Sequence, residues 1–169
     1  MVLPGEYTCR LKIKDKEYTC KFNCVHDDKN PDLSLADRRL VYEKSIQLQN
    51  LYNKINGSID TINKIQSVLM RDTVAFSKNK IARLFYDDLQ KIKAELTATK
   101  KLSIFADEER LREKVSELYA TFCGMESCPN NLQIEAIEGL EKDYKTGEEK
   151  LKKTVTTYLP KVKQLSPVN

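Results

Sequence analysis

The stretch from Val41 to Leu69 reads VYEKSIQLQNLYNKINGSIDTINKIQSVL and carries the strongest periodic pattern in the chain. Large apolar residues recur every seven positions along it, and further apolar residues fill the seam between them. The seven-residue series is Val41, Leu48, Ile55, Ile62 and Leu69, with Leu51, Ile59 and Ile65 between its members. Such a repeat is typical of a helix that packs against other helices as in a coiled coil. We expect this helix to begin near Ser34, because Ser34 and Asp37 form a capping-box pattern.

Gly57 interrupts this pattern. A glycine inside a helix costs roughly 1 kcal/mol relative to alanine. We therefore expect a neighbouring element to pack closely against Gly57, which would explain why no side chain stands there.

Working toward the C-terminus, the apolar spacing predicts further helices over about residues 77–101, 107–123 and 131–158, with Pro160 marking the end of the last one or a kink in it. The expected stripes are Ile81, Phe85, Leu89, Ile92 and Leu96; then Leu111, Val115, Leu118 and Phe122; then Ile137, Leu140, Tyr144, Leu151, Val155 and Tyr158, with Gly147 in the seam. Short connections favour antiparallel neighbours. The result is an antiparallel three-helix bundle whose middle member is broken near 102–107, or a four-helix bundle if that break is a full reversal.

Working toward the N-terminus, residues 6–13 and 17–25 alternate between apolar and polar side chains, which indicates two strands with one apolar face each. Lys14-Asp15-Lys16 supplies a tight polar turn between them. A lone hairpin is barely stable in water. Its apolar face must therefore rest on the helices of this chain or on strands that this chain does not contain.

These elements define a mainly α chain in three parts: a β-hairpin over 1–27, a polar linker over 28–33 and a helical bundle over 34–169.

The composition agrees with amphipathic helices that have wide solvated faces, since 40% of the 169 residues are apolar and 32% are charged. The net charge of +4 is modest, and most lysines are interleaved with acids, so we expect no nucleic-acid partner. Only the stretch from Lys150 to Lys163 is lopsidedly basic. No apolar segment reaches 18 residues, so no membrane span is predicted. The first residues lack the features of a signal peptide, which indicates a cytoplasmic chain or a piece of a longer or processed protein.

Groups that carry chemistry do not gather in the sequence. The single histidine, His26, stands in the linker, and no nucleophile motif or phosphate-binding loop is present. Asp87 and Asp88 are adjacent on a helix and point in different directions, so we interpret them as a solvated face rather than as a glycosidase pair. Acids in the linker do not follow a calcium-loop spacing. We predict no catalytic, cofactor-binding or metal-binding residues, and no cofactor.

The five cysteines are Cys9, Cys20, Cys24, Cys123 and Cys128. Our first interpretation is that they are small apolar core residues. The alternative is a disulfide within the hairpin or between Cys123 and Cys128, and the odd number leaves at least one thiol without a partner in the chain.

The stretch Pro4-Gly5-Glu6-Tyr7-Thr8, followed by Lys16-Glu17-Tyr18-Thr19 and a long helix, resembles the C-terminal region of bacterial sortilin-related BNR-repeat β-propeller proteins, which are often labelled glycosyl hydrolases. Asp28-Lys29-Asn30-Pro31 stands where that family has a compact Asp-Pro, and Tyr158-Leu159-Pro160 resembles its Leu-Pro segment. The resemblance implies an accessory piece at the cell envelope or outside the cell, whose hairpin ends an immunoglobulin-like sandwich. No catalytic residue of the family falls on this chain.

The leading functional hypothesis is a non-catalytic accessory or interaction module, the helical part of an exported propeller protein. Its partner would be a β-propeller or an immunoglobulin-like domain, and the expected docking residues are Tyr7, Leu11, Tyr18 and Phe22. The first alternative is a free-standing cytoplasmic adaptor that self-associates through the stripe at 41–69. The second is a fragment of a carbohydrate-active enzyme.

Overall fold

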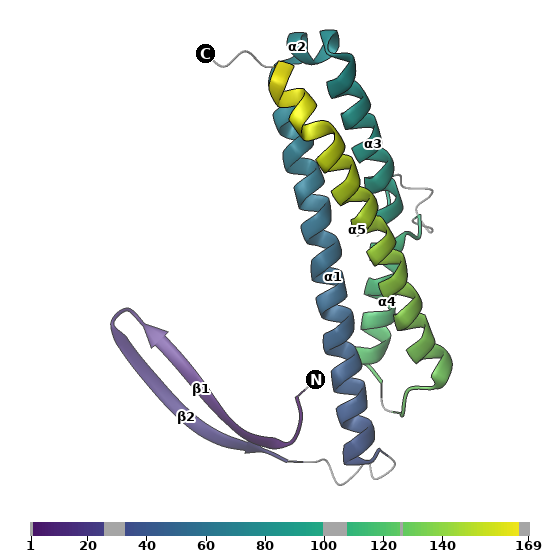
Figure 1. Cartoon of the computed structure of the whole chain (residues 1–169). Coiled ribbons are helices and arrows are strands. Elements are labelled where there is room, and N and C mark those ends of the chain that lie inside the picture. Colours follow the sequence, from purple (N-terminus) through teal and green to yellow (C-terminus); the bar gives the residue numbers. More distant parts are fainter. Residues whose placement is uncertain (1, 26–32, 100–107, 126, 166–169) are drawn as a thin grey trace.

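The computed structural model describes residues 2–25, 33–99, 108–125 and 127–165 (Figure 1). Within these residues a two-stranded antiparallel sheet is followed by five helices. The prediction of a mainly α chain that begins with a β-hairpin is therefore confirmed. His26 and most of the linker, as well as the break at 102–106, lie outside the described residues.

Helix α1 (Leu35–Leu69) is the helix that the seven-residue repeat predicts. Ser34 caps it: Ser34 Oγ accepts a hydrogen bond from Asp37 N at 3.1 Å, and Asp37 Oδ2 accepts one from Ser34 N at 3.2 Å. Such a reciprocal pair satisfies two main-chain donors that a helix start otherwise leaves free. Burial follows the repeat, since the fully or almost fully buried apolar residues of α1 are Val41, Leu48, Leu51, Ile55, Ile59 and Ile62.

After α1 the chain turns back through a short helix that the sequence analysis missed. Helix α2 (Thr73–Lys78) is capped by Asp72, whose Oδ1 accepts from Val74 N and Ala75 N at 3.0 and 2.9 Å. Phe76 packs edge-on against Tyr86, with 5.6 Å between the ring centroids. The second predicted helix consequently begins at Lys80 instead of near residue 77.

The return path of the bundle consists of α3 (Lys80–Leu96) and α4 (Leu111–Cys123). Figure 1 shows them following each other in the same direction, antiparallel to α1. The break between them is therefore not a reversal, and the bundle has three helical columns. Helix α3 packs mainly against α5, and α4 packs mainly against α1.

Helix α5 (Asn131–Leu165) forms the third column and continues through Pro160. A proline lacks the N–H that would bond to the carbonyl four residues earlier, and for this reason the sequence predicts a helix end near 158 or a kink at Pro160. The helix instead extends to Leu165. Packing on both sides of the proline outweighs this loss. Tyr158 stacks on Phe85 with 5.2 Å between centroids, and Val162 is partly buried against the same core.

Polar groups interrupt the apolar core at matched positions. Ser58 Oγ and Tyr144 Oη share a buried hydrogen bond of 3.2 Å between α1 and α5. Gln66 Nε2 donates to Gln90 Oε1 at 3.1 Å between α1 and α3. Buried polar groups must find partners, so pairs of this kind fix the register of the three columns.

Gly57 has no close neighbour, because a Cβ added there would meet nothing within 4 Å. The prediction of a close neighbour at Gly57 is wrong.

The hairpin consists of β1 (Gly5–Ile13) and β2 (Lys16–Cys24), within a residue of the predicted bounds. Ile13 pairs with Lys16, so Lys14 and Asp15 alone form the turn. Lys14 has a φ of 52°, which two-residue turns between antiparallel strands require and which glycine adopts more readily than lysine.

Candidate interaction surface

One side of the hairpin is mostly apolar, with Lys16 opposite Ile13 at the tip as its charged member. Because the strands alternate, residues paired across the sheet share a side, and the apolar side contains the pairs Tyr7–Phe22, Cys9–Cys20 and Leu11–Tyr18. We call this side the hairpin face and define it as Tyr7, Cys9, Leu11, Ile13, Tyr18, Cys20 and Phe22. Tyr7 and Phe22 stack with 5.9 Å between ring centroids. Cross-strand aromatic and aliphatic pairs of this kind stabilise a sheet.

The hairpin face is open to solvent. The exposed fractions of Leu11, Ile13, Tyr18 and Phe22 are 55%, 53%, 55% and 52%. Tyr7 is half-buried at the base, where its hydroxyl donates to the Leu3 carbonyl at 2.6 Å. Isolated exposed apolar side chains are ordinary, whereas a continuous apolar patch marks an interaction site.

The helices of the chain leave this face uncovered. Figure 1 shows the hairpin projecting away from α1, with its tip far from the bundle axis. By contrast, the bundle closes its own core: Phe85, Leu89, Val115 and Phe122 are all completely buried. A stable hairpin needs its apolar face to rest either on these helices or on something outside the chain, and the described helices do not supply the cover.

The opposite side of the hairpin is polar and carries its own ion pairs. Arg10 Nε lies 3.2 Å from Glu17 Oε1, and Lys21 Nζ lies 3.1 Å from Glu6 Oε1. Both pairs join the two strands diagonally, and both are exposed, so each contributes little stability. This polar side is well solvated. Covering the hairpin face, and not this side, would therefore remove apolar area from water.

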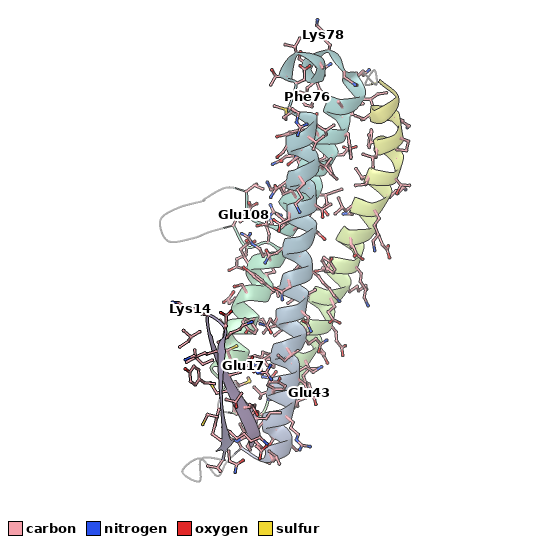
Figure 2. All side chains as sticks on the ribbon, turned by 90° about the vertical axis from the view of Figure 1, so that its left-hand side faces the viewer. Lys14, Glu17, Glu43, Phe76, Lys78 and Glu108 are labelled. Atoms are coloured by element: carbon pink, nitrogen blue, oxygen red, sulfur yellow. The ribbon has the colours of Figure 1, made fainter. Side chains whose placement is uncertain are left out.

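The tip of the hairpin is basic. Lys12, Lys14 and Lys16 stand around the turn, with Asp15 among them. Figure 2 shows Lys14 at the end of the hairpin farthest from its base, and Glu17 on β2 below it. A partner that covers the hairpin face would therefore meet positive charge at one end.

All four predicted docking residues lie on the hairpin face: Tyr7, Leu11, Tyr18 and Phe22. The structure adds Ile13, which is as exposed as its neighbours, and the cysteine pair in the middle. The same alternation that identified the four residues also contained the other three. Whether any of them binds a partner stays a prediction.

The cysteines lie outside the apolar core, contrary to the prediction. Cys9, Cys20, Cys123 and Cys128 are exposed, Cys24 is half-buried, and all five are free thiols. The interpretation that they are apolar core residues is therefore wrong. Residue type alone placed them in the core, whereas Cys9 and Cys20 lie on the hairpin face, which none of the described helices covers.

Charged groups at the surface of the bundle connect its columns. Asp88 Oδ2 accepts from the Tyr158 hydroxyl at 2.9 Å, and Asp88 Oδ1 accepts from Lys91 Nζ at 3.0 Å. Lys91 and then Tyr158 lower the pKa of Asp88, and the same carboxylate raises the pKa of Tyr158. Asp88 thus joins α3 to α5, and its role in the described residues is to connect two helices.

Glu113 closes the junction between α3 and α4. Its Oε1 accepts from Thr97 Oγ1 at 3.1 Å, and its Oε2 accepts from Ala98 N at 3.0 Å. Burial alone would raise the pKa of Glu113, but hydrogen bonds from the Ala98 amide and the Arg112 guanidinium outweigh burial and lower it. This carboxylate is the acceptor for a main-chain N–H that follows the end of α3.

The residues that the structure describes contain no group of three or more histidine, cysteine or acidic side chains placed to hold a metal ion. Among the described helices, none is both long enough and apolar enough to cross a membrane. No family model, curated protein or solved structure matches the chain. The fold and the surface together define the class: a three-column helical bundle that carries an amphipathic β-hairpin with an open apolar face.

Proposed function

We propose that this chain is a non-catalytic interaction module, and that the hairpin face is the surface that binds a protein partner. The observation that carries the proposal is the contrast in burial. The bundle buries the central residues of its apolar stripes completely, as at Ile55, Phe85 and Phe122, whereas four large apolar side chains of the hairpin each remain more than half exposed on one side.

The size of the patch supports binding. Side chains of this kind bury about 150–250 Å² each when fully covered, so covering the exposed half of the hairpin face removes on the order of 400 Å² from water. At about 25 cal/mol per Å², this contributes roughly 10 kcal/mol. Association itself costs about 4–15 kcal/mol. The face alone therefore gives marginal binding, and a stable complex needs further contacts.

The outer edges of the two strands can provide those contacts. The sheet has two strands, so each strand offers one row of main-chain donors and acceptors that no other described strand pairs with. A partner that adds a strand at this edge gains main-chain hydrogen bonds in addition to apolar burial. The best-fitting partner is thus a β-rich domain with an apolar sheet face or a free strand edge.

A β-propeller or an immunoglobulin-like domain has this character, and such a domain is the partner that the sequence resemblance implies. Self-association is the alternative, but the stripe at 41–69 does not favour it. Val41, Leu48, Ile55 and Ile62 are completely buried by the chain's own helices. The hairpin face is the surface that this proposal would assign to a second copy.

Photo-crosslinking on adjacent positions tests the proposal. Tyr18 is on the hairpin face and Thr19 is on the polar side. Each is replaced in turn by benzoylphenylalanine in the full chain. We expect a crosslinked partner from position 18 and little or none from position 19. Equal crosslinking from both positions, or from neither, would overturn the proposal.

The partner found in this way is then purified and titrated against variants. Leu11→Thr combined with Tyr18→Thr retains strand propensity while removing apolar area. We expect at least a tenfold weaker Kd for this variant. The control is Thr8→Ala combined with Thr19→Ala on the polar side, which should change Kd less than about threefold, or about 0.7 kcal/mol.

A further inference from the structure

The middle of the hairpin face consists of two thiols. Cys9 on β1 pairs directly with Cys20 on β2, and both side chains are exposed. Cys24, the third hairpin cysteine, is paired with Gly5 and has no thiol opposite it. The register thus selects one cysteine pair from the three that the hairpin could form.

The spacing of this pair suits a disulfide. The two-residue turn makes Ile13–Lys16 a hydrogen-bonded pair, and every second pair beyond it, including Cys9–Cys20, is of the same type. Cα atoms in such pairs are about 5.5 Å apart. Disulfides join residues whose Cα atoms are about 4.4–6.8 Å apart. The Cβ atoms must approach by about 1 Å or more, because hydrogen-bonded pairs lie at the wide end of the 4.5–5.5 Å range and a disulfide holds its Cβ atoms about 3.5–4.5 Å apart.

The two cysteines outside the hairpin have polar neighbours of their own. Cys128 hydrogen-bonds to the Asp37 carboxylate, which raises the pKa of its thiol, and Tyr119 hydrogen-bonds to Cys123. Since the thiolate is the attacking species, a raised pKa makes Cys128 a poorer nucleophile. Cys20 Sγ donates only a long contact of 3.7 Å to the Lys21 carbonyl, which a rotation about its χ1 angle breaks.

We propose that Cys9 and Cys20 are a modification site. They form a cross-strand pair of thiols that a small-molecule disulfide such as oxidised glutathione converts to a protein disulfide. One cysteine loses a proton, and its thiolate attacks the small disulfide. A protein–glutathione mixed disulfide forms, and one glutathione thiolate leaves. The second cysteine, as thiolate, attacks the protein sulfur of the mixed disulfide and expels the second glutathione. Two protein thiols are oxidised, and one small disulfide is reduced to two thiols.

The modification would fix the strand pairing at the centre of the hairpin face. A two-stranded sheet with no cover is only marginally stable, so a covalent link across it restricts opening and register slippage. The approach required of the Cβ atoms strains the bond and makes it easier to reduce than an unstrained disulfide. The inference depends on the strand register and not on the proposed function, so either can fail without the other.

Peptide mapping of the full chain tests the inference. The reduced protein is incubated at low concentration with oxidised glutathione, its free thiols are alkylated, and it is digested with trypsin without reduction. Cleavage after arginine and lysine places Cys9, Cys20 and Cys24 on three different peptides, 1–10, 17–21 and 22–29. We expect the first two to be joined, with the loss of two hydrogen atoms, while the thiol of Cys24 is alkylated.

Two variants sharpen the test. Cys24→Ser should leave the yield of the 9–20 link unchanged. Cys20→Ser should trap Cys9 as a mixed disulfide with glutathione. In the linked protein, main-chain amides of the hairpin should exchange at least tenfold more slowly than in the reduced protein. Mixed disulfides on both Cys9 and Cys20 without closure, links to Cys24 in equal yield, or links between two molecules would each overturn the proposal.

Discussion

Gly147 of α5 lies against Leu96 at the end of α3, so closely that a Cβ added to this glycine would be 3.2 Å from Leu96 Cδ2. Leu96 is almost completely buried and belongs to the core. The absence of a side chain at Gly147 therefore allows two columns of the bundle to approach each other. Gly57 of α1 and Gly139 of α5 have no such neighbour, since an added Cβ would meet nothing within 4 Å at either site.

This contrast predicts opposite effects of the same substitution. Gly57→Ala and Gly139→Ala should each stabilise the protein by about 0.5–1 kcal/mol, because alanine restricts the unfolded chain and favours the helix. Gly147→Ala should be destabilising by about 1 kcal/mol, because Leu96 must shift within a packed core. Urea denaturation followed by circular dichroism measures all three. A stabilising Gly147→Ala would show that Leu96 gives way at no cost.

The buried hydrogen bond between Ser58 and Tyr144 provides a second prediction. Tyr144 Oη also donates to the Lys54 carbonyl at 3.3 Å, so the hydroxyl connects α5 to α1 at two points. Tyr144→Phe should cost about 1 kcal/mol, since Ser58 loses its partner in a buried place. In the Tyr144→Phe background, Ser58→Ala should cost less than it does alone. A double-mutant cycle with no coupling between the two sites would contradict this contact.

The turn of the hairpin provides a third prediction. Lys14 adopts a left-handed φ of 52°, which costs lysine about 1 kcal/mol relative to glycine. Lys14→Gly should therefore slow amide exchange in the hairpin several-fold and leave exchange in the bundle unchanged. Asp15→Gly is the control, because Asp15 does not share the left-handed φ. Equal protection by both substitutions would show that the backbone of Lys14 carries no special cost.

Glu113 predicts how stability depends on pH. Its folded pKa is lowered, so it contributes stability that is fully present above its unfolded pKa and is lost as pH falls through the folded pKa. Glu113→Gln should cost about 1–2 kcal/mol near neutral pH, because charged acceptors make stronger hydrogen bonds. The difference from the unmodified protein should shrink below about pH 4. A difference in unfolding free energy that grows on acidification would contradict the assignment.

The sequence predicted the elements that depend on periodic apolar spacing. It did not predict the features that depend on individual side-chain contacts. The stripe from Val41 to Leu69 predicted a buried helix face, and the cap at Ser34 fixed its start within one residue. Alternation likewise gave both strands and the side of the hairpin that carries Tyr18. It could not show that the chain's own helices leave this side uncovered, because coverage depends on where the hairpin points.

The remaining errors have local causes. The apolar spacing predicted a single helix that starts near residue 77. Asp72 and Asn79 each cap a helix instead, so α2 ends and α3 begins around that position. Pro160 is a strong helix breaker on its own, but the stacking of Tyr158 on Phe85 keeps α5 helical beyond it. Close packing was expected at Gly57 because a glycine is costly inside a helix, but Gly57 stands two residues after Ile55 and therefore beside the apolar stripe. Gly147 stands within the stripe of its own helix, seven residues after Leu140, and it is the glycine that has a close neighbour.

Hydroxyl-radical footprinting of the isolated monomeric chain tests most directly whether the hairpin face is open. Each aromatic ring reports its own exposure to water, and the chain contains matched rings in both environments. Tyr18 and Phe22 are more than half exposed, whereas Phe85 and Phe122 are completely buried. We predict that Tyr18 and Phe22 are oxidised nearly as fast as in the urea-unfolded chain, while Phe85 and Phe122 are strongly protected. If Tyr18 and Phe22 were as protected as Phe122 in the monomer, the chain would cover its own hairpin, and no open face would remain for a partner.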